Sequence, residues 1–351
     1  MNENVKTVAS WFPDVGVVKH VERREGGHIH DTWFVSGTGT PPGAVLQRLN
    51  DHVFPDCARM MDNVVRVVAH LHGPLSVLRT GDGSVLAYDG EDTRPWRAFV
   101  RIEGAASPEV VESPEEALEV GRGLGRFLVE VQDLDGPALE EPIPGFKDFR
   151  RRRHAFEVLV DDDPYGRAMT CEDEIAAVRG FHRLVDELAS ARADGRLQTR
   201  IVHNDAKADN VLLDEDTGEA VCVIDLDTVA PGTVLFDIGD LLRSATVTAP
   251  EDDTDLGTLG VRDNLLEAAL QGYLAEAGPV LTDAERRLIP LAGPLMAYEN
   301  ALRFLTDHLA GDSYFRIERP RHNLDRARAQ LRVLEALDQA GDRVADLVQQ
   351  S

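Results

Sequence analysis

Residues 201–228 read IVHNDAKADNVLLDEDTGEAVCVIDLDT, and this stretch decides the fold. Two short apolar runs, 211–213 and 221–224, flank a polar turn that contains Gly218. This order of apolar run, glycine-containing turn and apolar run is typical of an antiparallel hairpin. Because a hairpin brings its open ends together, the pattern places Asn210, just before the first strand, beside Asp225, just after the second.

The polar residues at the open end of this hairpin are suited to phosphoryl transfer. The amide oxygen of Asn210 and the carboxylate of Asp225 are hard ligands of the kind that Mg²⁺ prefers. Asp205 lies on the loop that enters the hairpin, where a carboxylate can accept the proton of an attacking hydroxyl. Lys207 follows two residues later, and its ammonium can neutralise charge on a transferred phosphoryl group. The alternative is a surface hairpin with ordinary capping acids.

Two neighbouring residues are expected to have structural roles. We expect His203 to pack under the loop and to hydrogen-bond Asp225 or the backbone. Asp237, in the segment that follows the hairpin, is expected to cap a helix or to hold the loop through its backbone amides.

On either side of the hairpin the sequence shows two kinds of pattern. Residues 1–102 look rich in strands, and residues 103–351 look mainly helical. The predicted strands are 16–23, 32–37, 44–49, 76–79, 84–88 and 96–102. The predicted helices are 55–72, 113–134, 172–192, 261–276, 282–309 and 323–348. We interpret the arginine run 150–153 as a solvated basic patch and 161–164 as a charged loop. The glycines at 121–125 are expected to allow close helix packing. The sequence thus predicts an α+β protein with two lobes.

The overall composition narrows the class of partner. The net charge is −25 and the pI is about 4.8. Such a surface repels phosphate backbones and anionic lipids, so we expect a small-molecule substrate and neither nucleic acid nor membrane as partner. The sequence has no apolar run near the roughly 20 residues of a membrane span and no secretory pattern at its start. We expect a cytoplasmic monomer or weak homodimer. The three cysteines are too far apart to indicate a zinc site or a disulfide framework.

Together these residues resemble the aminoglycoside phosphotransferase/choline kinase superfamily, whose members share the protein-kinase-like fold. The resemblance rests on segments 203–210, 224–229 and 231–237. It extends to segments 27–29, 46–50, 54–56, 96–97, 302–305 and 311–315, and so covers nearly the whole chain. The last two segments, combined with the central motif, are similar to the N-acetylhexosamine 1-kinases.

The resemblance implies ATP and Mg²⁺ as cofactors and the anomeric hydroxyl of N-acetylglucosamine or N-acetylgalactosamine as acceptor. It implies that Asp205 is the catalytic base, beside which we expect Lys207 to act as argued above. Asn210 and Asp225 would be the metal ligands. The implied substrate-binding residues are His28, Asp205, Thr228, Arg303 and Tyr314. For Arg303 the alternative is a buried salt bridge with Glu299, and for Tyr314 it is closure of the core.

The nucleotide is expected to contact the N-terminal lobe. Gly26 and Gly27 can offer backbone N–H groups to phosphates, or can form a simple hairpin turn. Thr32 can add a hydroxyl or simply begin a strand. Phe99 and Ile102 lie in the expected connector between the lobes, where backbone groups can pair with adenine; the alternative is an ordinary buried strand.

The resemblance departs from the general kinase pattern at Gln47, where a strand lysine should hold the ATP phosphates. The chain has only four lysines, and the nearest on either side of this position are Lys19 and Lys147. Strand alternation directs Arg48 to the other face. The helix 55–72 also lacks the paired glutamate. We therefore predict that Lys207, as the only active-site lysine, meets the phosphate charge together with metal and backbone amides.

Two other functions stay open. One is a kinase for a different alcohol, such as an aminoglycoside, choline, homoserine or another sugar. The other is a non-catalytic nucleotide-binding module, which the missing lysine favours and which the intact Asp205, Asn210 and Asp225 disfavour.

Overall fold

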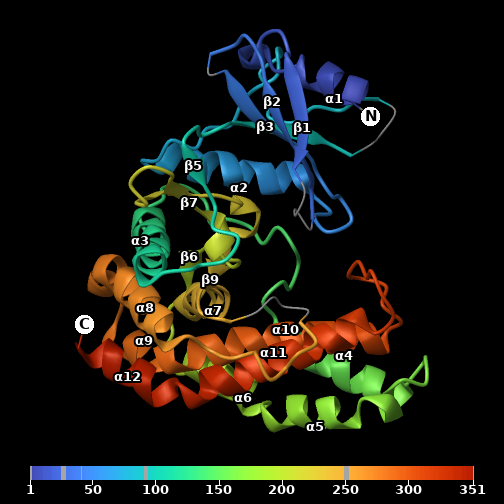
Figure 1. Cartoon of the computed structure of the whole chain (residues 1–351), viewed down its shortest axis with the longest axis vertical. Helices are drawn as coiled ribbons and strands as arrows, with labels where there is room; N and C mark the ends of the chain where they lie inside the picture. Colours follow the sequence, from blue (N-terminus) through green and yellow to red (C-terminus); the bar gives the residue numbers. More distant parts are fainter. Residues whose placement is uncertain (1, 25–28, 41, 91–93, 249–252, 351) are drawn as a thin grey trace.

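A computed structural model describes residues 2–24, 29–40, 42–90, 94–248 and 253–350. It contains a smaller strand-rich N-terminal part and a larger, mainly helical C-terminal part (Figure 1). The predicted α+β fold with these two parts is confirmed. Gly26, Gly27 and His28 lie outside the described residues.

The N-terminal part is built on a four-stranded antiparallel sheet in the order β1-β2-β3-β4. The strands are β1 (His20–Arg24), β2 (Asp31–Ser36), β3 (Gly43–Arg48) and β4 (Trp96–Val100). The predicted strands at 76–79 and 84–88 are wrong, because each forms only one bridge to β4, through Val77 and Ala87. The unpredicted helix α1 (Asn2–Ala9) adds apolar side chains to the core on one face of the sheet.

The register sets four side chains in a row across this sheet. Arg24 pairs with Thr32, Thr32 with Gln47, and Gln47 with Arg97. The neighbouring residues Trp33, Leu46 and Trp96 belong to the core that α1 joins. Since successive side chains of a strand point to opposite faces, the row of Thr32, Gln47 and Arg97 lies on the face away from α1.

Helix α2 (Cys57–His70) lies between the sheet and the helical part (Figure 1). Asp56 caps it by accepting a hydrogen bond from the backbone N–H of Arg59. Its buried residues Met60, Val64 and Val67 join the large core of the C-terminal part and not the core of the sheet. The lobe boundary at residue 102 stays a prediction.

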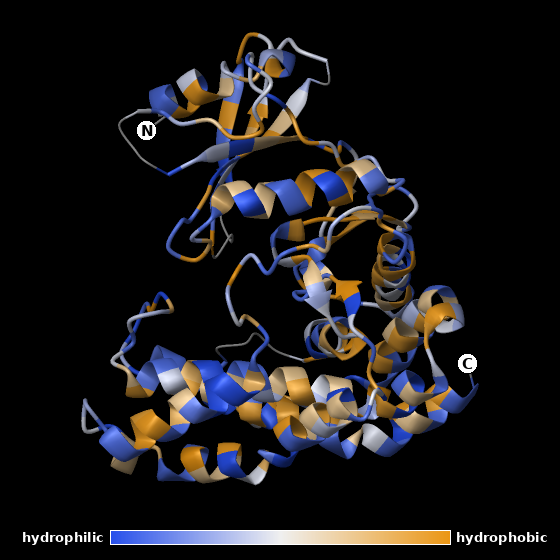
Figure 2. Ribbon diagram, turned by 180° about the vertical axis from the view of Figure 1, so that it is seen from behind, coloured by the Kyte–Doolittle hydropathy of each residue, from blue (hydrophilic) through white to orange (hydrophobic). Residues whose placement is uncertain are grey.

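The C-terminal part consists of helices around a few short strands, and its outer helices carry both hydrophilic and hydrophobic residues (Figure 2). The helices are α3 (Pro114–Val131), α4 (Phe149–Asp162), α5 (Glu172–Gly180), α6 (Arg183–Ala193), α7 (Val234–Ala245), α8 (Asp263–Ala277), α9 (Asp283–Leu288), α10 (Ala292–Leu309), α11 (His322–Gln339) and α12 (Gly341–Gln350). The strands are β5 (Ala105–Ala106), β6 (Arg200–Val202), β7 (Val211–Asp214), β8 (Ala220–Val223) and β9 (Ala230–Gly232). In the part of the chain that the structure describes, every helix is too short or too polar to cross a bilayer.

Close packing of α3 on α8 depends on glycine, as predicted. A Cβ atom on Gly121 would lie 2.1 Å from the carbonyl oxygen of Ala269, and one on Gly272 would lie 2.0 Å from that of Leu118. Any larger residue at either position would push the two helices apart.

Helix α4 corrects part of two interpretations: residues 161–162 are helical and not loop, and only Arg150 and Arg151 of the run 150–153 are exposed, as predicted. Asp148 caps the helix by accepting a 2.9 Å hydrogen bond from the N–H of Arg151. Phe149 and Phe156, seven residues apart, are both buried and anchor one face. Arg152 lies on the inner side, where its Nε is 3.3 Å from Glu299. The run of arginines concealed this amphipathic pattern.

Candidate active site

The predicted hairpin exists, and its open end gathers the predicted catalytic residues. Strands β7 and β8 pair antiparallel, with Val211 opposite Val223. Beyond this pair, the N–H of Ile224 donates a 2.8 Å hydrogen bond to the carbonyl of Asn210. Asp225 follows directly, in a left-handed backbone conformation with φ 58°.

Asp237 at the start of α7 holds the loop that enters the hairpin. Its carboxylate accepts hydrogen bonds of 2.8 Å from the backbone N–H groups of both His203 and Asn204. Burial raises the pKa of Asp237 to about 6. The ring of His203 is fully buried, and its Nε2 lies 2.9 Å from the carbonyl of Ile224. The structural roles predicted for His203 and Asp237 are confirmed.

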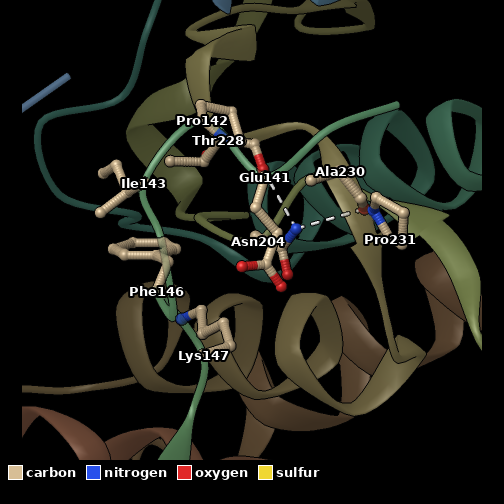
Figure 3. A pocket seen from close by; sticks show the side chains of 9 residues that line it. All are labelled: Glu141, Pro142, Ile143, Phe146, Lys147, Asn204, Thr228, Ala230 and Pro231. Carbon is tan, nitrogen blue, oxygen red and sulfur yellow. Dashed lines mark hydrogen bonds between the residues drawn. The ribbon is translucent and has the colours of Figure 1, made fainter. Parts of the chain in front are cut away.

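Asn204 and Thr228 connect this loop to the segment after the hairpin. Asn204 has φ 64°, and its side-chain N–H groups donate to the carbonyls of Thr228 and Ala230 at 3.0 and 3.3 Å. The hydroxyl of Thr228 donates to the carbonyl of His203 at 2.8 Å. Thr228, predicted to bind substrate, therefore uses its hydroxyl to position the loop, although it also lines the adjoining pocket (Figure 3).

Asp205, Lys207 and Asn210 lie together at the hairpin end. Lys207 Nζ is 3.5 Å from the carboxylate of Asp205, and the Asn210 side chain donates to the Asp205 carbonyl at 2.7 Å. Burial acts to raise the pKa of Asp205. The ammonium groups of Lys207 and Lys147 outweigh burial and hold that pKa below its ordinary value. A carboxylate in this setting is ionised at neutral pH.

The residues present fit a divalent cation next to Asp225. Burial, together with the nearby carboxylates of Asp227 and Asp205, raises the pKa of Asp225, so added positive charge would be favourable here. Because the Asn210 amide nitrogen bonds the loop, its Oδ1 is the atom left to face a cation. Among the described residues, no three His, Cys, Asp or Glu side chains converge as a metal site. Mg²⁺ commonly takes its remaining ligands from water and phosphate.

A second lysine, Lys147, adjoins the site and was not predicted. It lines a pocket with Asn204 and Thr228 (Figure 3). Its Nζ lies 2.9 Å from Glu299 on α10 and 3.6 Å from Asp240 on α7. The prediction that Lys207 is the only lysine of the site therefore needs correction. Apart from the scarcity of lysine in the chain, the sequence around Lys147 carries no signal of this position.

Arg303 and Tyr314, predicted to bind substrate, lie in one aromatic cluster. The Arg303 guanidinium lies over the rings of Phe146 and Phe315, at 5.8 and 5.2 Å from their centroids. Tyr314 meets Phe315 edge-on at 4.8 Å. The carboxylate of Glu299 bonds Lys147 and not Arg303. Because Phe146 precedes Lys147 in the chain, this cluster continues into the pocket beside the catalytic loop.

On the sheet, the predicted nucleotide-binding residues are partly engaged with one another. The Gln47 amide donates to the Thr32 hydroxyl at 3.2 Å. Arg48 points to the other face, as predicted, and bonds Asp31 at 2.6 Å. Phe99 pairs with Val45 inside β4. Ile102 lies two residues beyond the end of that strand.

Comparison with known proteins places this geometry in context. A family model described as "Phosphotransferase enzyme family" matches residues 20–287. The fold is similar to that of a microcompartment-associated aminopropanol kinase, with a TM-score of 0.63 and 14% identity over 98% of this chain and 99% of that one. It is also similar to a choline kinase from Cryptosporidium parvum Iowa II, with a TM-score of 0.60 and 13% identity over 98% of both chains. A spectinomycin phosphotransferase in complex with ADP and spectinomycin gives a TM-score of 0.56 and 12% identity over 92% of this chain and 94% of that one.

Proposed function

Since the chain belongs to the phosphotransferase enzyme family, we propose that it transfers the γ-phosphoryl group of ATP to the anomeric hydroxyl of an N-acetylhexosamine. The product is the sugar 1-phosphate. The observation that carries the proposal is the meeting of Asp205, Lys207, Asn210 and Asp225 at one end of the β7–β8 hairpin. Membership of this family supports phosphotransfer to a small molecule, and the choice of acceptor rests on the sequence resemblance.

In the proposed reaction the acceptor oxygen attacks the γ-phosphorus of ATP. A new P–O bond forms, the bond to the β-phosphate oxygen breaks, and ADP leaves. Asp205 accepts the hydroxyl proton, and its low pKa keeps it in the basic form at neutral pH. Lys207, held 3.5 Å from Asp205, compensates the charge of the phosphoryl group in transit.

Asn210 and Asp225 would hold Mg²⁺ in this site. When bound, Mg²⁺ neutralises phosphate charge during transfer. Asp237 and Asn204 contribute by fixing the loop backbone through the hydrogen bonds described above, so that Asp205 keeps its place. Phosphoryl transfer depends mainly on such positioning.

The acceptor is proposed to occupy the space between the catalytic loop and the aromatic cluster of Phe146, Arg303, Tyr314 and Phe315. Tyr314 is 60% exposed, so its ring is available to stack on a sugar. Arg303 has a guanidinium held between two rings, from which it can donate to sugar oxygens. His28 stays a proposed sugar contact. The proposed nucleotide contacts are Gly26, Gly27, Thr32, Gln47 and Ile102, together with Phe99 as part of the neighbouring strand.

A second candidate is an amino alcohol acceptor, such as choline, homoserine or an aminoglycoside. The observation that favours it is Glu141, whose carboxylate lines the pocket beside Asn204 and Lys147 (Figure 3). A carboxylate there could pair with a substrate ammonium. The relatives described above include kinases named for aminopropanol and choline.

The proposed base is tested with Asp205→Asn and Asp216→Asn, assayed for ADP release with Mg-ATP and N-acetylhexosamine. Asp216 lies in the exposed turn at the far end of the same hairpin and serves as the matched control. We expect Asp205→Asn to lower kcat by roughly a hundredfold to ten-thousandfold and the control to keep wild-type activity. Near wild-type ADP release by Asp205→Asn would mean that another group removes the proton.

A further inference from the structure

Arg97 on β4 is a fully buried charge at the junction between the sheet and the catalytic segment. It is 1% exposed. Its two terminal nitrogens form a fork on the carboxylate of Asp227, with the Nη2 contact at 2.8 Å. Asp227 itself is 3% exposed and lies two residues after Asp225. A bidentate buried pair of this kind has a defined geometry, because the planar guanidinium matches the carboxylate.

A second residue of the sheet side reaches the same carboxylate. His30, just before β2, has Nε2 2.7 Å from Asp227 Oδ2. Its Nδ1 accepts a 3.0 Å hydrogen bond from the backbone N–H of Asn50. This assigns the ring proton to Nε2, so His30 donates to Asp227. Three donors from the N-terminal part therefore fix the segment that carries Asp225.

The third guanidinium nitrogen of Arg97, Nε, fixes the orientation of Gln47. Arg97 Nε donates to Gln47 Oε1 at 2.9 Å. With its oxygen held by Arg97, the Gln47 amide must direct its N–H groups the other way, and one of them donates to Thr32 Oγ1 at 3.2 Å. The second N–H is then left to meet a ligand on this face of the sheet. Arg97 itself is enclosed, with all three guanidinium nitrogens engaged by Gln47 and Asp227.

We infer that Arg97 is a positioning residue for the ATP phosphates: it orients the Gln47 amide toward them and ties the sheet to the segment that carries Asp225. The inference rests on the proposed phosphotransferase function. Arg97 acts through Gln47 and Asp227 and does not touch the nucleotide. The side-chain donors of Thr32 and Gln47 face the phosphates. The ion pair of Arg97 and Asp227 fixes the position of these donors relative to the segment that carries Asp225.

The test compares binding of ATP and of adenosine by calorimetry. Arg97→Met alone leaves the Asp227 carboxylate buried without its main partner and can unfold the protein. The principal variant is therefore Arg97→Met combined with Asp227→Asn, with folding checked by thermal melting. The control is Arg48→Met, since Arg48 is the neighbour of Gln47 on β3 but bonds Asp31 on the other face.

We expect the double variant to bind ATP at least about tenfold more weakly, the loss that one oriented hydrogen bond to a charged group accounts for, and to bind adenosine as the wild type does. In a Gln47→Ala background the same double change should cost less ATP affinity than it costs in the wild type, because part of its effect passes through the Gln47 amide. The Arg48→Met control should bind both ligands normally.

Three results would overturn the inference: wild-type ATP affinity in the double variant, equal losses for ATP and adenosine, or a full additional loss in the Gln47→Ala background. These are distinct from failure of the proposed function. A wild-type protein that binds no ATP would contradict the function itself, and the inference with it.

Discussion

Asn204 and Asp225 hold the left-handed backbone conformation that most residues avoid, and both belong to the candidate active site. Asn and Asp tolerate it better than other non-glycine residues. Such conformations persist where the surroundings enforce them, and here Asp237 anchors the backbone N–H of Asn204. Two of the five described non-glycine residues with positive φ therefore lie where the chemistry is proposed.

Several buried charges in this molecule have oppositely charged partners that explain how they are tolerated. Glu285 on α9 is fully buried and forms a fork with Arg200 at the start of β6, at 2.8 and 2.9 Å. Thr282 completes a capping box with the same carboxylate. Because β6 leads into the catalytic loop, this pair anchors the strand that positions Asp205.

Glu285→Gln should lower the free energy of unfolding by about 3 kcal/mol at pH 7, since it leaves a buried guanidinium without its partner. Burial acts to raise the pKa of Glu285, but hydrogen bonds from Arg200 and Thr282 outweigh it and hold that pKa below the ordinary value of 4.5. A depressed folded pKa gives stability that is full above the unfolded value and is lost as the pH falls through the folded one.

The measurement is urea unfolding of wild type and Glu285→Gln between pH 7 and pH 3. The difference between the two proteins should shrink as the pH falls below about 4.5. A difference that stays constant across this range would show that the ion pair does not account for the effect.

At the scale of elements, α10 presents three polar positions of the candidate site on one face. Glu299, Arg303 and Asp307 follow one another at four-residue spacing, so they line the same side of the helix. The carboxylate of Asp307 accepts hydrogen bonds from the backbone N–H groups of Ser313, Tyr314 and Phe315, at 2.8 to 3.0 Å. One side chain of α10 thus shapes the turn that carries Tyr314.

Asp307→Ala should release this turn and raise the KM for the acceptor several-fold, while the KM for ATP stays near the wild-type value. Three backbone donors lose their acceptor, which costs about 1–3 kcal/mol each when they stay buried, so partial opening of the turn is expected. Steady-state kinetics with each substrate varied in turn gives the comparison.

Asp338→Ala is the matched control, because Asp338 on α11 forms only a partly exposed ion pair with Arg183. Equal increases in both KM values for Asp307→Ala would indicate a general loss of structure and would contradict the role of the turn in acceptor binding.

Short-range sequence patterns were sufficient to predict many of the helices and strands. The β7–β8 hairpin, the strands of the sheet and most long helices follow from apolar periodicity and turn residues. Helix α4 was missed because four arginines follow Phe149 and dilute the apolar face. Proline also divides one predicted helix, since Pro290 interrupts the segment between α9 and α10.

The candidate site was predictable to the extent that its residues lie on one hairpin. Asp205, Lys207, Asn210 and Asp225 are close in sequence, and the hairpin alone brings them together. Arg97 was not predicted as a site residue because its partner Asp227 is 130 positions away. Lys147 likewise meets Glu299 from 152 positions away. Contacts of this range depend on how whole elements pack.

At the scale of the whole molecule, buried polar contacts connect the two parts in addition to the apolar residues of α2 that join the large core. Arg97 and His30 bind Asp227 from the sheet side. Asn63 on α2 donates to the carbonyl of Glu140 at 2.7 Å, in the segment before the pocket. The segment that follows β8, where phosphotransfer is proposed to take place, is thus bound directly from the sheet side.

The most direct test of this account is phosphorus NMR of the product formed from Mg-ATP and a panel of acceptors. The panel contains N-acetylglucosamine, N-acetylgalactosamine, choline, homoserine and an aminoglycoside. The account predicts a new signal from phosphate on the anomeric carbon of an N-acetylhexosamine, absent with Asp205→Asn. Phosphate on another hydroxyl, or on a non-sugar acceptor alone, would contradict the proposed sugar 1-kinase.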